Sequence, residues 1–146
     1  MGSKSPKEFW RVEDERSRGR TDSTSFTAPY RDGKEALNNR ILLEKHLKWA
    51  NREPTPYISV YDNWDAANNE VGRRLNRGRM DVSMSRIDVS KVPAGKLQYR
   101  SVRRLCDRLG VEIEDKAWFN SKHEWIFLNE IPANVVVEEC SYYELR

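Results

Sequence analysis

The sequence predicts a single α+β domain whose sheet is largely antiparallel. Amphipathic helical segments fall mainly in the first half of the chain, whereas short strand-like segments gather towards the end, and this arrangement is typical of α+β folds. A length of 146 residues corresponds to one domain of ordinary size. Five Trp, six Tyr and four Phe provide apolar surface for a core, so the composition argues against a disordered chain.

The first elements are a strand and a helix separated by a long polar segment. Residues 1–7 are expected to be a disordered tail or a cloning scar, which leaves one domain over residues 8–146. A strand is predicted over residues 9–12, and the non-periodic stretch 13–33 has the length of a functional loop. A helix over 34–50 follows, and its imperfect apolar face consists of Leu37, Ile41, Leu42 and Trp49.

The middle of the chain contains the clearest strand–helix pair. Residues 57–61 are β-branched or aromatic around one serine, which predicts a strand. Asp62 or Asn63 can cap the helix that follows, and Gly78 can end it in a left-handed conformation. Spacings of three and four residues predict that one face of this helix is formed by Trp64, Ala67, Val71 and Leu75.

The second half of the chain alternates extended segments with one short helix. Residues 80–89 predict a pair of half-strands because their apolar residues alternate. Ser101 can cap a helix that ends at Gly110. Two more strands are predicted over residues 124–128 and 134–140.

Cysteine spacing and hydropathy exclude several classes of protein. Cys106 and Cys140 form no CxxC pair, so a zinc site is not expected and both are predicted to be buried free thiols, with a disulfide as the minor alternative. No stretch has the roughly 18 apolar residues of a membrane span. We therefore expect a cytoplasmic protein without a membrane partner, unless a leader that directs secretion has been removed.

The charge balance gives little support to nucleic-acid binding. The net charge is only +3, from 26 basic and 23 acidic side chains. A solvated surface is the preferred interpretation of the local basic clusters, and a phosphate or polyanion contact is the alternative. These clusters comprise Arg16, Arg18 and Arg20, and then Arg73, Arg74, Arg77 and Arg79.

Three residues are candidates for a functional site. Glu124 opens an apolar strand directly after a polar loop, so its carboxylate could accept a hydrogen bond from a ribose hydroxyl and stabilise a developing positive charge. Ser59 lies in the middle of a strand, where a buried hydroxyl needs a partner. Arg11, on the first strand, could present its guanidinium to a diphosphate. The alternatives are an exposed glutamate, an outward-facing serine and a surface ion pair.

The two histidines receive a weaker interpretation. His46 and His123 are far apart in sequence, and no Ser-His-Asp order, phosphate-binding loop or metal-binding helix motif accompanies them. His123 precedes Glu124, but adjacent residues of a strand face opposite sides. We therefore expect His123 to be structural or exposed.

The segments around Arg11, Ser59 and Glu124, taken in the order in which they occur along the chain, resemble the Arg-Ser-Glu class of the ADP-ribosyltransferase superfamily. The run from Glu124 to Pro132 is also similar to that class, and the overall look is most similar to a fungal family of such domains. The resemblance implies a split, mostly antiparallel sheet around an NAD cleft, with NAD as substrate and no metal. It also implies that Arg11 contacts NAD, that Ser59 supports the site and that Glu124 is catalytic and binds the ribose 2′-hydroxyl.

The resemblance implies further contacts with NAD and with an acceptor, and this chain also departs from the family pattern at some positions. Tyr61 or Phe119 would stack on the nicotinamide, and Trp118 would lie in the acceptor-recognition loop. Many members have Ser-Thr-Ser where this chain has Ser59 followed by Val and Tyr, and members that modify arginine have Glu or Gln where this chain has Lys122. We therefore expect a monomer that acts on NAD with a different protein or nucleic-acid acceptor, an NAD glycohydrolase, or an inactive fold that only binds. A nucleic-acid-binding domain is the more distant alternative.

Overall fold

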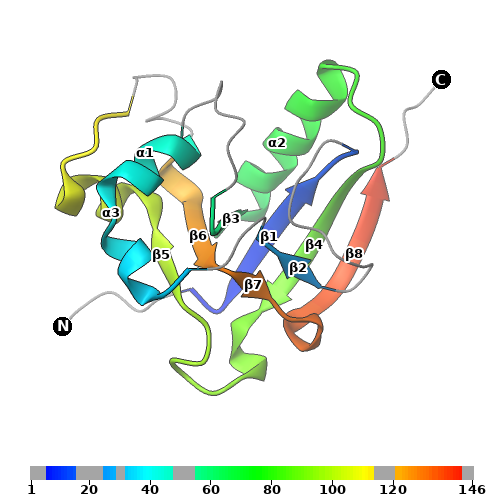
Figure 1. Ribbon diagram of the computed structural model, residues 1–146. Helices are drawn as coiled ribbons and strands as arrows, with labels where there is room; N and C mark the ends of the chain where they lie inside the picture. The colour runs from blue at the N-terminus through cyan, green and yellow to red at the C-terminus, as the bar shows by residue number, and fades with distance from the viewer. Residues whose placement is uncertain (1–5, 16–24, 29–31, 48–54, 114–120, 143–146) are drawn as a thin grey trace.

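The computed structural model describes residues 6–15, 25–28, 32–47, 55–113 and 121–142, and it confirms an α+β domain with a mostly antiparallel sheet (Figure 1). This part of the chain contains a six-stranded sheet, a two-stranded ribbon and three α-helices. The order across the large sheet is β5 (Tyr99–Ser101), β6 (Glu124–Leu128), β3 (Tyr57–Tyr61), β1 (Glu8–Glu13), β4 (Val82–Asp88) and β8 (Val136–Tyr142).

The large sheet consists of two halves that are joined weakly. In the half formed by β1, β4 and β8, β1 pairs with β4 along its whole length, from Glu8 opposite Asp88 to Glu13 opposite Ser83. In the half formed by β5, β6 and β3, all five residues of β3 pair with β6. Between the halves, the register of the described strands has a single pair, Trp10 opposite Tyr61. We call these parts the β1 half and the β3 half.

Each half has its own helical cover. Helix α2 (Trp64–Asn76) packs on the β1 half, where Ala67 and Val71 share a buried cluster with Val12, Val82 and Met84. Helices α1 (Arg40–Leu47) and α3 (Val102–Leu109) cover the β3 half, as Figure 1 shows. The cluster under these two helices includes Leu43, Tyr57, Leu105, Cys106, Ile126 and Leu128.

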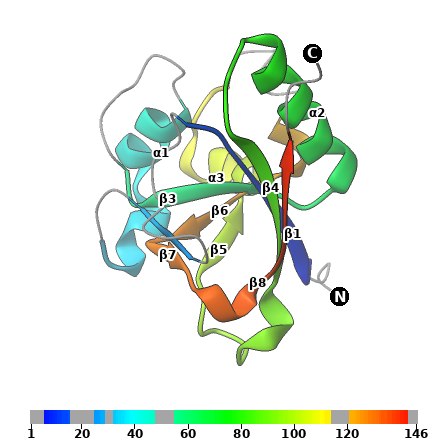
Figure 2. The same cartoon turned by 90° about the vertical axis from the view of Figure 1, so that its right-hand side faces the viewer.

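A third apolar cluster holds the two halves together. Phe9 of β1 and Phe127 of β6 meet edge to face, with ring centroids 5.2 Å apart. The short ribbon of β2 (Phe26–Thr27) and β7 (Glu130–Ile131) closes over this cluster, to which Phe26 and Ile131 contribute. Figure 2 shows the ribbon beside the β3 half. The halves are therefore joined mainly by packed side chains, because the main-chain ladder between them is short.

The helix predicted over residues 34–50 is divided in two. A short 3₁₀ helix, Lys34–Asn38, precedes α1, and the backbone is extended at Asn39. The side-chain oxygen of Asn39 accepts a hydrogen bond from the Leu42 amide at 3.0 Å and so begins a new helix. This break rotates the apolar face, so Ile41 is 68% exposed whereas Leu43 is buried. The predicted core position Trp49 lies outside the described residues.

The strand–helix pair in the middle of the chain is confirmed with one correction. Strand β3 has the predicted bounds, and Asn63 caps α2 through a 2.9 Å bond from the Ala66 amide to its side chain. Gly78 is left-handed, with φ of 75°. Trp64 is 49% exposed, so its prediction as a core residue is wrong. In the first turn of a helix, spacing alone does not decide which side chains the sheet covers.

Three further expectations for the extended segments need correction. The residues predicted as two half-strands form the single strand β4, with a register shift between Arg86 and Ile87. The last strand begins at Val136 after a 3₁₀ turn, Ala133–Val135, rather than at residue 134. Cys140 is exposed because β8 is an edge strand, whereas Cys106 is buried as predicted, and both are free thiols.

Candidate functional site

Ser59 connects the two charged residues that the sequence singled out. The Nη1 atom of Arg11 donates a hydrogen bond to the main-chain oxygen of Ser59 at 2.8 Å. The hydroxyl of Ser59 donates to Oε2 of Glu124 at 3.1 Å. The structure therefore brings these three residues together, although Arg11 and Glu124 contact different groups of Ser59.

The position of Arg11 follows from the split in the sheet. The β1–β3 ladder consists of one pair, and the guanidinium of Arg11 bonds to a β3 carbonyl near that pair. The side chain of Arg11 is only 11% exposed, and it lies 3.8 Å from the carboxylate of Glu13 and 5.9 Å from the ring centre of Phe26. Desolvation lowers the pKa of Arg11 to about 10 although Glu13 opposes it, so Arg11 remains a cation at neutral pH.

Glu124 is held in an environment that disfavours its charge. It lies opposite Tyr61 where β3 and β6 pair, so both side chains share one face of the sheet. Burial raises the pKa of Glu124 to about 7, the bond from Ser59 opposes this shift, and the carboxylate of Glu70 adds to it. Glu124 therefore titrates close to neutral pH rather than in the ordinary acidic range of a carboxyl group.

Tyr61 is a half-buried neutral phenol beside this carboxylate. Its pKa is raised above the ordinary value by burial first, and then by the charges of Glu124 and Glu70. Phe119, the other predicted stacking residue, lies outside the described residues, as does Trp118. Lys122, two residues before Glu124, is exposed in a short 3₁₀ turn.

His46 also belongs to this cluster, although no motif in the sequence pointed to it. Its Nε2 atom lies 2.7 Å from the hydroxyl oxygen of Ser59, and its Nδ1 atom lies 2.7 Å from the hydroxyl oxygen of Thr55. Helical spacing could have identified it, because His46 follows the buried Leu43 by three residues and therefore lies on the same side of α1.

His123 has the structural role that was expected. Its Nδ1 atom lies 2.8 Å from one carboxylate oxygen of Asp62, and the indole of Trp125 donates to the other oxygen at 2.9 Å. The Asp62 amide also donates to the main-chain oxygen of His123. These bonds connect the turn after β3 to the start of β6, and they set where Glu124 begins its strand.

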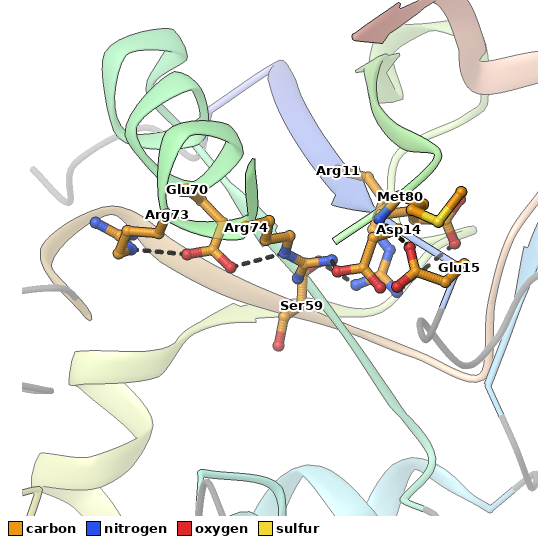
Figure 3. A network of polar contacts seen from close by, with 9 residues as sticks. Arg11, Asp14, Glu15, Ser59, Glu70, Arg73, Arg74 and Met80 are labelled. Carbon is orange, nitrogen blue, oxygen red and sulfur yellow. Dashed lines mark hydrogen bonds and ion pairs between the residues drawn. The ribbon is translucent and has the colours of Figure 1, made fainter. Parts of the chain in front are cut away.

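A chain of ion pairs runs from α2 to Asp14, the residue that follows β1 (Figure 3). The carboxylate of Glu70 accepts hydrogen bonds from Arg73 and Arg74, each at 2.8 Å. Arg74 also bonds to Asp14 at 3.2 Å. Arg73 and Arg74 are therefore neutralised by acids of the same domain, which weighs against a phosphate contact by this pair.

The part of the chain that the structure describes contains neither a metal-binding group nor a helix that could span a membrane. Residues 6–15, 25–28, 32–47, 55–113 and 121–142 contain no group of three or more His, Cys, Asp or Glu side chains placed to bind a metal ion. In the same part of the chain, no helix is both long enough and apolar enough to cross a bilayer.

Comparison with known proteins identifies a family for the whole domain. No curated protein sequence matches the chain. A family model described as a domain of unknown function, DUF7587, matches residues 4–145, which is nearly the full length and includes every element described above. The chain therefore belongs to the DUF7587 family.

Proposed function

We propose that this domain has an ADP-ribosyltransferase-like fold and cleaves the nicotinamide–ribose bond of NAD, as an ADP-ribosyltransferase or an NAD glycohydrolase. The observation that carries the proposal is the link through Ser59, which holds Arg11 at its carbonyl and Glu124 at its hydroxyl. The short ladder between the two halves of the sheet also supports it, because the resemblance implies a split sheet.

Glu124 would act on the ribose and on the developing charge. Its carboxylate would accept a hydrogen bond from the 2′-hydroxyl while the carbon–nitrogen bond breaks and its electron pair leaves with nicotinamide. The ribose then carries positive charge, which a nearby carboxylate stabilises in a site of low dielectric. Water, or the nucleophilic group of an acceptor, would form the new bond to the anomeric carbon and release a proton.

Arg11 and Tyr61 would bind the rest of NAD. Arg11 remains a cation although it is buried, so it can hold phosphate or ribose oxygens. Tyr61 lies opposite Glu124 and offers an aromatic ring for the nicotinamide, a role that Phe119 could share. The acceptor would be a protein or a nucleic acid, or water in the case of the glycohydrolase.

Ser59 would orient its neighbours rather than attack a substrate. A serine nucleophile needs a histidine that accepts its proton at neutral pH and that a carboxylate orients. Burial, with a further contribution from Arg11, lowers the pKa of His46 to about 4, and its Nδ1 atom contacts the hydroxyl of Thr55. This geometry disfavours a Ser-His hydrolase.

A domain of the same fold that binds without catalysis is the second candidate. Arg11 already bonds to the Ser59 carbonyl, and Glu124 already accepts a hydrogen bond from the Ser59 hydroxyl, so both groups are held by the protein itself. Lys122 also replaces the Glu or Gln that the resemblance would lead one to expect for arginine modification. Calorimetry with NAD separates the candidates from a domain that does not recognise NAD at all.

Release of nicotinamide from NAD tests the proposal. Glu124→Gln keeps the shape of the side chain and removes its charge, so we expect turnover to fall by about 100-fold or more. Glu112→Gln changes an exposed glutamate outside the site and should retain the activity of the parent. Mass spectrometry of a cell lysate incubated with the parent and NAD would identify a modified acceptor. The catalytic role is wrong if Glu124→Gln releases nicotinamide as fast as the parent.

A further inference from the structure

The contacts of His46 point to a function for this residue. It lies in the last turn of α1 and reaches the middle of β3, where Nε2 meets the Ser59 hydroxyl. Its ring is fixed on a second side by Thr55 and packs edge to face on Tyr57, with ring centroids 5.4 Å apart. Thr55 is itself buried. A ring held at both nitrogens and against an aromatic neighbour has one orientation.

The number of hydrogens available to His46, Ser59 and Glu124 determines which atom donates and which accepts in each of their hydrogen bonds. Ser59 has one hydroxyl hydrogen, and an ionised Glu124 can only accept, so Ser59 must donate to Glu124. The 2.7 Å contact between Ser59 and His46 then requires the hydrogen of Nε2. His46 Nδ1 carries no hydrogen in this tautomer, so it accepts from the hydroxyl of Thr55.

We infer that His46 is a positioning residue: its Nε2–H group makes the Ser59 hydroxyl a donor to Glu124 and thereby stabilises the ionised carboxylate. A hydroxyl that accepts a hydrogen bond is a stronger donor in the next one. The low pKa of His46, about 4 because of burial and then of Arg11, keeps the ring neutral near pH 7. His46 therefore orients Ser59 without adding a charge.

The other groups that face Glu124 do not supply this stabilisation. From α2, Glu70 repels its charge. Burial, and then the charge of Glu124, raise the pKa values of Tyr61 in β3 and of Cys106 in α3, the latter to about 11. Both groups therefore stay protonated at neutral pH. Arg11 contributes electrostatically to His46, and its bond is to the carbonyl of Ser59. The hydrogen bond from Ser59 lowers the pKa of Glu124, whereas burial and the charge of Glu70 both raise it.

The titration of the Glu124 carboxyl tests the inference without any substrate. Carbon NMR of the glutamate carboxyls, with the Glu124 signal assigned from Glu124→Gln, gives the midpoint in each variant. His46→Leu removes the donor, so we expect the midpoint to move to higher pH by about 0.5 to 1 pH unit. His46→Gln places an amide donor near the position of Nε2 and should restore most of the parent value. An unchanged or lowered midpoint in His46→Leu would overturn the inference.

A second pair of variants covers the case in which His46→Leu does not fold. Thr55→Val removes the hydroxyl that selects the tautomer, whereas Thr55→Ser keeps it. We expect the midpoint of Glu124 to be higher in Thr55→Val than in Thr55→Ser. Nitrogen NMR of the parent, recorded well above the midpoint, should show the hydrogen on Nε2. Equal midpoints, or a hydrogen on Nδ1, would refute the assigned direction.

The catalytic consequence rests on the proposed function, whereas the effect on the carboxyl does not. If the domain cleaves NAD, kcat/KM should rise with pH through the midpoint of Glu124, and His46→Leu should shift this profile to higher pH by the same amount as the NMR midpoint. A parent that does not release nicotinamide refutes the proposed function and leaves the NMR result standing. A shifted midpoint with an unshifted pH profile would refute the catalytic part of the inference.

Discussion

The interactions that hold each half of the sheet together differ from those that join the two halves to each other. Inside the β1 half, β1 and β4 pair over the full length of β1, and the link across the surface is the exposed cluster of Arg86, Glu8 and Glu138. Between the halves, a single register pair is supplemented by the buried bond from Arg11 to the Ser59 carbonyl. Main-chain ladders therefore hold each half, whereas side chains hold the junction.

The difference explains where the candidate site lies. A continuous ladder uses its main-chain groups on neighbouring strands, so it leaves few of them to orient a functional side chain. At the junction, a β3 carbonyl accepts from the buried guanidinium of Arg11, and the hydroxyl of the same residue orients Glu124. The charged side chains of Arg11 and Glu124 are thus held by Ser59 at the junction, where the hydrogen-bonded ladder between strands is shortest.

The largest expected effect comes from breaking the buried link. Arg11→Lys keeps the charge but loses the fork that reaches both Ser59 and Glu13, so we expect the free energy of unfolding to fall by about 1.5 to 3 kcal/mol. Arg86→Lys is the matched change in the β1 half. There the partners are 47% and 68% exposed, and the loss should stay below about 1 kcal/mol. Urea unfolding of both variants measures the difference.

Equal losses in the two variants would contradict this comparison of the junction with the β1 half. A second readout is NAD affinity by calorimetry, which depends on the proposed function. Arg11→Lys should weaken NAD binding, whereas Arg86→Lys should leave it unchanged. The stability result stands whether or not NAD binds.

Local patterns in the sequence predicted the elements that carry the site. β3 and β6 are each five residues long and consist mostly of aromatic and aliphatic residues, and both strands have the predicted bounds. Strand β2 was missed because two residues, Phe26 and Thr27, cannot show an alternating pattern and pair with residues about 100 positions away. The exposure of Ile41 and Trp64 was missed because the side of a helix that the sheet covers depends on tertiary packing.

The candidate site was predicted in part for the same reason. Arg11, Ser59 and Glu124 lie in recognisable strands, so their order in the sequence predicted their association. His46 lies on a helix whose register changed at Asn39, and its contact with Ser59 depends on how α1 packs on the β3 half. The stacking role of Phe119 stays a prediction.

The pH dependence of stability can separate the two half-buried titratable groups that contact Ser59, Glu124 and His46. The pKa of Glu124 is raised from 4.5 to about 7, so its contribution to stability is present below pH 4.5 and is lost as the pH rises through 7. The pKa of His46 is lowered from 6.5 to about 4, so its contribution is present above pH 6.5 and is lost as the pH falls through 4. Between these limits the two contributions offset each other in the parent.

Removing either titratable group should reveal the contribution of the other to the pH dependence of stability. In His46→Gln, the free energy of unfolding should rise as the pH falls from about 7 to 4.5, and in Glu124→Gln it should fall as the pH falls from 6.5 to about 4. Each slope should approach about 1 kcal/mol per pH unit, since one proton is worth about 1.4 kcal/mol per unit. Chemical unfolding at several pH values measures both slopes. Slopes of the same sign in the two variants would contradict the assignment.

The smallest expected effects compare the helices that cover the two halves. Asn63 caps α2 on the β1 half, and its side chain accepts from the Ala66 amide at 2.9 Å. Ser101 caps α3 on the β3 half, but its oxygen lies 3.5 Å from the Arg104 amide, at the limit of a hydrogen bond. We expect Asn63→Ala to cost about 1 kcal/mol of unfolding free energy and Ser101→Ala about half of that. A larger loss for Ser101→Ala, measured by urea unfolding, would show that the start of α3 depends on its cap more than this distance indicates.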